Sequence, residues 1–383
     1  MNMKKRILSL LVTTAIVMIS CGDKGDDTPK TIEQLKPVVY EKEAPKTIAS
    51  KKTGNVVIDP TTGKNQYEYL STVQEQYAIT PLSIVSETMS DVIYPGSMLR
   101  GDSFVKGKYD PLTLRNEFAP VTLSISLRGD IKVSETTKPT LSDVRQVMND
   151  LITLQANKVN YHFVPTVFAY ESNTVTTEEH FKTSLKVHAE ANVIAGLLKA
   201  NFDYQKDNSN SLTKSYVMVA FRQHIYNVSI DPKHYSTWVI GYIDVKDMGE
   251  YEPLYISSVD YGRVGYIFVE TNKSAEEVRK MVKASLEVAV KYIDANANAH
   301  YTNEFQRLFQ EGKVKLKISG GPVELGNKVD NYESFKKFVQ MPNEKNITET
   351  SVPISYKVRR LKDNTEVQVI DTYTHNIVEL KKN

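Results

Sequence analysis

Two segments of this 383-residue chain fit both the period of an amphipathic strand and the period of an amphipathic helix. In the first, 180–205, six of the seven odd positions from 181 to 193 are apolar, and none of the six even positions between them is. After Ala195-Gly196 the apolar positions become even: Leu198, Ala200, Phe202 and Tyr204. This pattern is typical of two half-exposed strands joined by a turn. Phe181, Leu185, Ala189, Val193 and Leu197 nevertheless recur every four residues, as on one helix face.

The second segment, 278–305, repeats this double pattern. Its even positions as far as Tyr292 are apolar except Lys280, whereas the odd positions from 279 to 291 are polar except Met281 and Ala289. The apolar positions then become odd: Ala295, Ala297, Ala299, Tyr301 and Phe305. A helical stripe through Val278, Val282, Leu286, Ala289 and Ile293 is equally available. For the resting protein we therefore expect helices over 180–200 and 275–310, packed on a sheet.

The same residues also suit a second, membrane-spanning state. A transmembrane strand needs about 9–11 residues that alternate between lipid-facing apolar and lumen-facing polar side chains. We expect inserting segments at about 178–207 and 273–306. The residues expected to face lipid are Phe181, Leu185, Val187, Val193, Phe202, Val282, Leu286 and Val288. Those expected to face the lumen are Lys182, Lys186, Lys283 and Glu287. Because open strand edges are not tolerated in lipid, this state requires an oligomer.

Around these segments the pattern predicts an α+β fold. Strand patterns are found at Tyr161–Tyr170, Tyr216–Ile230, Tyr261–Glu270 and Val314–Ile318, the last of which alternates. We expect these four strands to form a long, bent antiparallel sheet. A further strand is expected at Val121–Leu127 and a helix at Leu141–Leu154. Near the end, Ile354–Arg360 and Glu366–Ile370 flank Lys362-Asp363-Asn364, which indicates a hairpin.

The start of the chain has the pattern of an export signal. Lys4, Lys5 and Arg6 precede an apolar stretch that is too short to span a bilayer and ends in Ser20-Cys21. A small residue before a cysteine resembles the cleavage box of bacterial lipoproteins, which implies acylation of Cys21; a plain secretory signal is the alternative. We expect a signal peptide at 1–20, a lipid-anchored flexible tether at 21–66 and a core at 67–383.

Composition excludes several classes of function. The net charge is +2, and three of the positive charges lie in the expected leader, which argues against a nucleic-acid surface. A single cysteine excludes a disulfide framework. The seven histidines show no metal-binding spacing, and GxSxG, GxGxxG and P-loop motifs are missing. We therefore expect no enzyme, no cofactor and no metal.

Four short motifs resemble those of the cholesterol-dependent cytolysins. They are Asp91–Leu99 (DVIYPGSML), Ser257–Arg263 (SSVDYGR) with Glu270–Ser274 (ETNKS), the pair Gly320-Gly321, and Val352–Tyr356 (VPISY) with Leu361–Asn364 (LKDN). They follow the order of the family and cover about Tyr67 to Leu380. The resemblance implies domains 1–3 of that fold, with an elongated, bent sheet flanked by two helical clusters. It also implies that both double-pattern segments unfurl into transmembrane hairpins of a large β-barrel pore.

This chain departs from the family pattern in its fourth domain. The Trp-rich, Cys-containing membrane loop has no counterpart, and Trp238, the only Trp, lies elsewhere. We therefore expect no direct cholesterol binding. Short family members of Gram-negative bacteria act with a longer companion that binds the membrane, and they often need proteolytic release. The expectation is an outer-membrane or surface lipoprotein that forms homo- or hetero-oligomers and causes cytolysis in a target bilayer.

Two motifs are candidates for controlling assembly. Gly320 and Gly321 precede Pro322, so they permit a sharp bend that we expect to act as a hinge exposing Tyr261–Glu270 to the next subunit; an ordinary turn is the alternative. By resemblance, Tyr261-Gly262-Arg263 couples strand pairing to release of the helices, with Arg263 bound to a carboxylate or a helix end. The alternative function is a surface-anchored binding or adhesion lipoprotein that keeps the fold without forming pores.

Overall fold

The computed structural model describes residues 31–39, 43–79, 91–106, 108–161, 167–177, 211–289, 299–321, 329, 331–340 and 348–382. Its helices are α1 (Gly101–Phe104), α2 (Leu141–Met148), α5 (Ala275–Ala289), α6 (Ala299–Gln310) and α8 (Tyr332–Gln340). A π-helical turn, Asn149–Thr153, continues α2.

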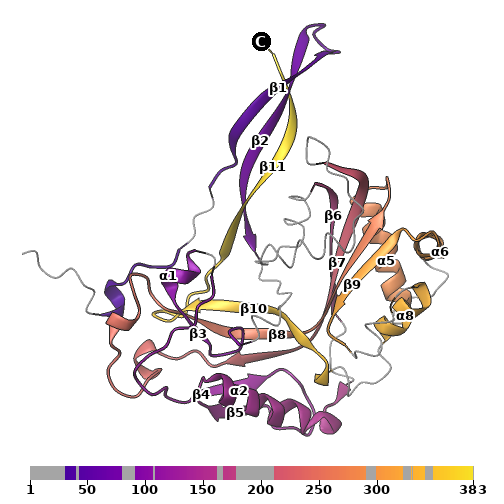
Figure 1. Ribbon diagram of the computed structural model, residues 1–383. Coiled ribbons are helices and arrows are strands. Elements are labelled where there is room, and N and C mark those ends of the chain that lie inside the picture. The colour runs from indigo at the N-terminus through magenta and orange to yellow at the C-terminus, as the bar shows by residue number, and fades with distance from the viewer. Residues whose placement is uncertain are drawn as a thin grey trace, which may run out of the picture.

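The main sheet has eight antiparallel strands, and the long strand β8 (Leu254–Glu270) runs through it. The other strands of this sheet are β3 (Met98–Leu99), β4 (Val121–Ile125), β5 (Ser134–Thr137), β6 (Val167–Thr177), β7 (Ser211–Ile230), β9 (Val314–Ser319) and β10 (Val352–Arg360). The sheet order is β10-β8-β7-β4-β5; in addition, β3 and β9 pair with β8, and β6 pairs with β7. Figure 1 shows that β8 bends, so that its first half lies beside β10 and its second half beside β9.

Two apolar cores lie on the two halves of the bent sheet. The core of the first half includes Val144 and Leu151 of the α2 region, Trp238, and Val259 of β8. The core of the second half joins β7 and β8 to α5, α6 and α8, which lie together at the right of Figure 1. The expected α+β fold with a bent antiparallel sheet is confirmed, whereas the expected helix at 180–200 lies outside the described residues.

A second, three-stranded sheet projects from the body in the order β1-β2-β11. Its strands are β1 (Lys46–Ile58), β2 (Asn65–Ile79) and β11 (Val369–Lys381). Every residue of β1 is exposed, so this strand has no buried period that sequence could reveal. The expected flexible tether at 21–66 is therefore wrong for β1 and the start of β2. It is also wrong around Ile32 and Leu35, which are buried in the first core.

Other expected elements differ mainly at their ends. Strands β7, β8 and β9 contain the expected ranges, and α5 and α6 lie within 275–310. The hairpin after β10 is confirmed by a bridge between Arg359 and Glu366. The strand expected at Tyr161–Tyr170 is corrected: Tyr161 has 3-10 helical geometry, and the described strand β6 runs from Val167 to Thr177.

Candidate functional site

The bend of β8 lies where this strand changes its neighbour. Strand β10 pairs with β8 as far as Gly262, opposite Val352, and β9 takes over from Val264, opposite Ser319. Strand β7 is continuous along the other side of β8, but its register shifts between His224 and Tyr226. A shift on one neighbour and a change of partner on the other increase the local twist and let the sheet bend here.

Three glycines make this junction possible. A Cβ atom on Gly262 would lie 1.9 Å from the carbonyl oxygen of Gln223, so only glycine allows the two backbones to approach this closely. Gly320 and Gly321 follow β9 with φ angles of +84° and +91°. A Cβ on Gly320 would lie 2.7 Å from the carbonyl oxygen of Gly262. The expected hinge and the expected coupling motif are thus in direct contact.

Arg263 is buried at the same junction, with 2% of its surface exposed. Its Nη1 donates to the carbonyl oxygen of Phe338 at 2.6 Å, its Nη2 to that of Val339 at 3.3 Å, and its Nε to Oε1 of Gln223 at 2.9 Å. The guanidinium also lies 4.5 Å from the ring centre of Phe338. Phe338 and Val339 belong to the last turn of α8, where carbonyl groups lack partners within the helix.

The chemistry of Arg263 therefore links the sheet to a helix end, which is one of the two arrangements that we expected. Burial lowers the pKa of Arg263 to about 9, so the side chain is still cationic at neutral pH. Its hydrogen bonds to described residues all go to neutral oxygens. A buried cation whose partners are neutral is costly to keep in the fold, which makes this contact sensitive to movement of α8.

A polar cluster that sequence reasoning missed lies beside Gly262. Asp260 of β8 accepts hydrogen bonds from Asn227 Nδ2 at 2.7 Å and from the hydroxyl of Ser355, and its Oδ1 lies 3.2 Å from Nε2 of His224. Burial works to raise the pKa of Asp260, but the hydrogen bonds from His224, Ser355 and Asn227 outweigh it and lower the pKa to about 2. The cluster joins β7, β8 and β10 on the first half of the sheet.

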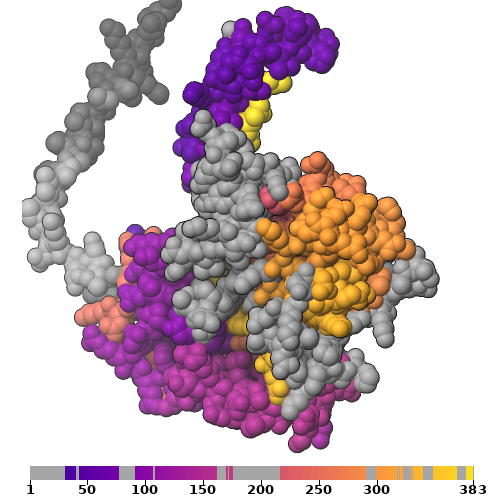
Figure 2. Space-filling view, turned by 45° about the vertical axis from the view of Figure 1, so that its right-hand side comes forward, coloured from indigo at the N-terminus to yellow at the C-terminus, as the bar shows by residue number. Residues whose placement is uncertain are grey.

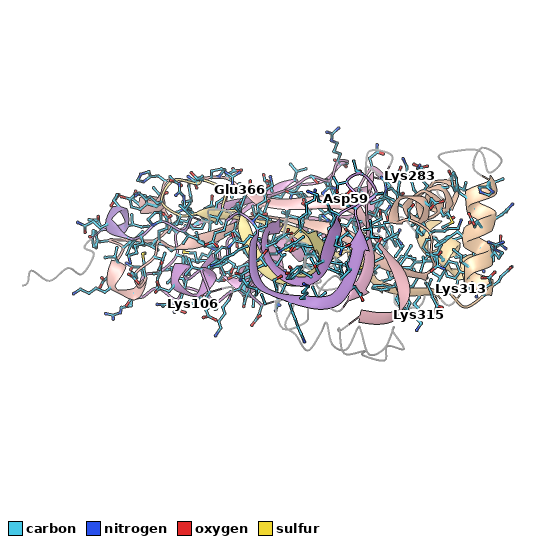
Figure 3. The ribbon with its side chains drawn as sticks, turned by 90° about the horizontal axis from the view of Figure 1, so that it is seen from above. Asp59, Lys106, Lys283, Lys313, Lys315 and Glu366 are labelled. Carbon is cyan, nitrogen blue, oxygen red and sulfur yellow. The ribbon has the colours of Figure 1, made fainter. Side chains whose placement is uncertain are left out.

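Helix α5 begins with a capping box. The Ser274 hydroxyl accepts a hydrogen bond from the backbone N–H of Glu277, and the Glu277 carboxylate accepts one from the backbone N–H of Ser274. Val282 and Leu286 are fully buried against the sheet, while Val288 is only half-buried because it lies about 200° around the helix from Leu286. Lys283 is exposed and lies 3.6 Å from Glu287. In Figure 3, Lys283 lies along one side of the flattened body and Lys315 along the other.

Both double-pattern segments connect strands that are already paired. The chain leaves β8 at Glu270 and returns in β9, where Val314 pairs with Val269. Likewise it leaves β6 at Thr177 and returns in β7, where Ser211 pairs with Thr177. Each segment is thus an insertion in an antiparallel hairpin of the main sheet.

The family model for thiol-activated cytolysins matches residues 79–382, which is most of the chain. The chain belongs to the thiol-activated cytolysin family. It is 26% identical to perfringolysin O of Clostridium perfringens over 322 residues, covering 80% of this chain and 61% of that protein. It is 28% identical to pneumolysin of Streptococcus pneumoniae over 295 residues, covering 73% and 59%. This cytolysin thus spans about three fifths of the length of these relatives.

Solved structures of toxins share the fold of this cytolysin. The human-specific toxin intermedilysin matches with a TM-score of 0.59 at 23% identity, over 91% of this chain and 72% of that one. A structure described as a Gram-negative toxin matches with a TM-score of 0.57 at 20% identity, over 91% of this chain and 74% of that one. At these identities the likeness establishes the fold alone.

The expected role of the hinge in this cytolysin needs one correction. Tyr261–Glu270 cannot be an edge that a strand after Gly321 uncovers, because β7 pairs along one side of it and β10 and β9 pair along the other. Among the described strands, the two edges of this half of the sheet belong to β6 and to β9, and β9 is the strand before the glycines. Tyr261 itself is buried and stacks on Tyr226, with ring centres 5.1 Å apart.

Several expected site residues of this cytolysin lie outside the described residues: Cys21, Phe181, Lys182, Leu185, Lys186, Val187, Val193 and Phe202. None of the described helices has the length and hydropathy needed to cross a bilayer. Within the described ranges, no group of three or more His, Cys, Asp and Glu side chains is placed to bind a metal ion. Trp238 is fully buried in the first core.

Proposed function

We propose that this cytolysin is a component of a pore. It oligomerises and converts the segments at about 178–207 and 273–306 into transmembrane hairpins of a large β-barrel. The observation that carries this proposal is the register of the strands that flank each segment. The family name and the description of its solved neighbours as toxins agree with a lytic role.

The register of β8 and β9 predicts how the second segment would pair. In this pair, opposed residue numbers always sum to 583, as for Val264 with Ser319 and Val269 with Val314. Continuing the same ladder past Glu270 would set Val282 opposite Tyr301. Other pairs would be Val278 with Phe305, Leu286 with Ala297, and Val288 with Ala295. Since opposed side chains share one face, the apolar positions of both arms would face lipid together.

The register of β6 and β7 gives a parallel result for the first segment. From Val167 to Val175, opposed residue numbers sum to 391. Continuing this ladder would set Val187 opposite Tyr204 and Val193 opposite Leu198, with the turn at Ala195-Gly196. The resting structure leaves this register, since Thr177 pairs with Ser211 rather than with position 214. The proposed conversion therefore includes a three-residue shift at the end of β6.

The free-energy terms on the two sides of the proposed conversion are similar, so the conversion would need a trigger. In the resting protein Val282 and Leu286 are already buried against β7 and β8, so a bilayer replaces one apolar environment with another. The additional gain is the closure of every strand edge in the ring. Lys283 and Glu287 would face the lumen, where charges cost little compared with about 2–4 kcal/mol for a basic residue facing lipid.

Assembly would begin at the junction of β8, β9 and α8. We infer that movement of the chain at Gly320-Gly321 frees the outer edge of β9 for a neighbouring subunit. This movement would change the contacts of Arg263, because Arg263 binds the end of α8 and lies beside both glycines. Acylation of Cys21, a longer companion and proteolytic release remain parts of this proposal that rest on the resemblance of the sequence.

Environment-sensitive dyes on single cysteines test the conversion, after Cys21 is replaced. Probes at positions 286 and 288 should both report lipid in leaking membranes, while a probe at 287 reports water. A helix cannot give this result, because 286 and 288 lie about 200° apart on it. Positions 185, 186 and 187 provide the same test in the first segment. If the protein binds cells without causing leakage, and the probes at 185–187 and 286–288 keep the pattern of a helix, the adhesion lipoprotein is favoured instead.

A further inference from the structure

The distal end of the projecting sheet carries aliphatic side chains that nothing in the described structure covers. Their exposed fractions are 50% for Val56, 41% for Val57, 65% for Ile58, 62% for Val378 and 47% for Leu380. We call these five residues the tip patch. Figure 2 shows the end of this sheet standing clear of the body. A patch of this kind on an isolated element marks an interaction site.

The tip patch covers both faces of the sheet. Val56 pairs with Tyr67 and Ile58 with Asn65, so these two side chains share one face. Val57 pairs with Gln66, and Leu380 pairs with Glu68, so these side chains share the opposite face. A protein partner would cover one face of such a sheet. A tip that is apolar on both faces can bury both only in an environment that surrounds it, such as the interface of a lipid bilayer.

Charge at the tip favours an anionic surface. The stretches 51–68 and 376–382 contain five lysines, Lys51, Lys52, Lys64, Lys381 and Lys382, against three acidic residues. All three carboxylates have partners within the sheet. The Asp59 carboxylate accepts a hydrogen bond from the backbone N–H of Thr61 and lies 3.4 Å from Nζ of Lys382. The Glu68 carboxylate accepts hydrogen bonds from the side chains of Thr53 and Asn55. The Glu379 carboxylate accepts one from the Ser71 hydroxyl and lies 2.9 Å from Nζ of Lys381. The turn after β1 thus presents little free negative charge.

Tyrosines complete the pattern below the apolar residues. Tyr67 and Tyr69 lie on the face of Val56, with the ammonium groups of Lys52 and Lys381 at 3.4 Å and 5.4 Å from their ring centres. Aromatic and basic side chains next to an apolar tip are typical of elements that dip into the headgroup region of a bilayer. In Figure 1 the tip projects in the same direction as the second half of β8 runs. Figure 3 looks down on the molecule from this direction, and Asp59, at the base of the turn after β1, lies near its centre.

We propose that the tip patch inserts into the headgroup region of an anionic lipid bilayer and so binds the cytolysin to membranes directly. The aliphatic side chains enter the interface from both faces of the sheet, and the surrounding lysines bind acidic headgroups. This inference goes beyond pore formation, because it concerns binding that precedes any conversion of the helices.

Vesicle co-sedimentation tests the proposal, using full-length protein with Cys21→Ser so that acylation plays no part. The vesicles contain phosphatidylcholine alone or phosphatidylcholine mixed with phosphatidylserine. Wild-type protein should prefer the anionic vesicles, and high salt should weaken the preference. The double variant Val57→Asp/Ile58→Asp should bind roughly tenfold less. The matched control is Ile240→Asp/Tyr242→Asp, which adds the same charge at side chains that are 58% and 74% exposed and remote from the tip.

Equal binding by the tip variant and the wild-type protein would overturn the proposal, and so would equal losses in the tip variant and the control. Circular dichroism verifies that each variant is folded. The variant Lys51→Gln/Lys64→Gln keeps the apolar tip and should lose only the preference for phosphatidylserine. Sedimentation velocity without vesicles tests the remaining alternative. If the wild-type protein self-associates and the tip variant does not, the tip patch binds a second copy of the chain and the proposal is overturned. Dye release is measured separately, so failed binding and failed pore formation remain distinguishable.

Discussion

The two halves of strand β8 have different neighbours, although they belong to one continuous strand. The first half, Leu254–Tyr261, pairs with β10, which joins β11 through a short turn. The second half, Val264–Glu270, pairs with β9, and the chain between these two strands forms α5 and α6. The first half thus pairs with a strand from much later in the chain, whereas the second half carries a long insertion between itself and its partner.

Both halves pack on an apolar core, but the polar contacts added to each core differ. Beside the first half, Asp260 binds His224, Asn227 and Ser355. Beside the second half, Ile267 and Val269 pack against apolar side chains of α5. Directional polar contacts fix one arrangement, whereas apolar contacts can be exchanged for other apolar surroundings. In the proposed conversion, the first half would stay as a scaffold while the helices on the second half repack.

The junction between the halves should give the largest effect. In Gly262→Ala, the added methyl would overlap the carbonyl oxygen of Gln223, 1.9 Å from the ideal Cβ position. We expect a loss of about 3 kcal/mol or more in the free energy of unfolding, because both backbones must move. Urea denaturation measures the change. An unchanged midpoint would show that the close approach is not needed for the bend.

Arg263→Ala should give the next largest effect, on the second half only. It leaves the last carbonyls of α8 and the Gln223 amide without their donor, at a cost of about 2–3 kcal/mol. If Arg263 reports hinge movement, the variant also changes the rate at which assembled rings become open pores. Arg263→Lys is the matched control, because it keeps the charge but its single ammonium nitrogen cannot take the places of the three guanidinium nitrogens that donate here. Normal conversion rates in both variants would remove Arg263 from the mechanism.

Asp260→Asn tests the first half through its pH dependence. Asp260 has a pKa lowered from 3.8 to about 2, so its contribution to stability is complete above about pH 4 and is lost as the pH falls towards 2. We expect the variant to lose about 1–2 kcal/mol at neutral pH, a figure reduced for partial exposure of the carboxylate. Unfolding curves of both proteins should converge in acid. A difference that stays constant down to about pH 2 would contradict this account.

Ser274→Ala should give the smallest effect and sharpen the comparison. It removes the capping box of α5 and should cost about 1 kcal/mol, confined to the helix that the second half carries. Hydrogen exchange should be faster in α5 and unchanged in β10. If the proposed conversion is correct, pore opening should be faster, because the helical state is weakened. Slower opening would indicate that the helix itself has a role in the pore pathway.

The sequence predicted the strands that are rich in apolar residues and missed elements that are exposed. Strands β7 and β8 contain long apolar stretches and β9 alternates, so their existence could be predicted without the structure. Strand β1 is exposed throughout and leaves no such pattern. Helix α8 was missed although a signal exists: the Asn331 side chain caps the backbone N–H of Ser334, and Tyr332, Phe335 and Phe338 follow at helical spacing.

The candidate site was predictable only as separate motifs. Gly320-Gly321 and Tyr261-Gly262-Arg263 were recognised individually, but their contact depends on how β9 returns beside β8. The partner of Arg263 lies in a helix that sequence reasoning did not identify. The Asp260 cluster was missed because Asp260 lies 36 residues from His224 and 95 from Ser355, distances over which sequence pattern carries no pairing information.

The ladder between β8 and β9 restricts how this part of the chain can change in length. Opposed positions sum to an odd number, so every even position faces the same way as its odd partner. In the proposed pore, one residue added to a single arm between Glu270 and Val314 would reverse the parity beyond it and turn charged side chains toward lipid. Changes in pairs, or at the turn near positions 291 and 292, would preserve the pattern. In a family alignment, insertions in this segment should therefore come in even numbers within the arms and in any number at the turn.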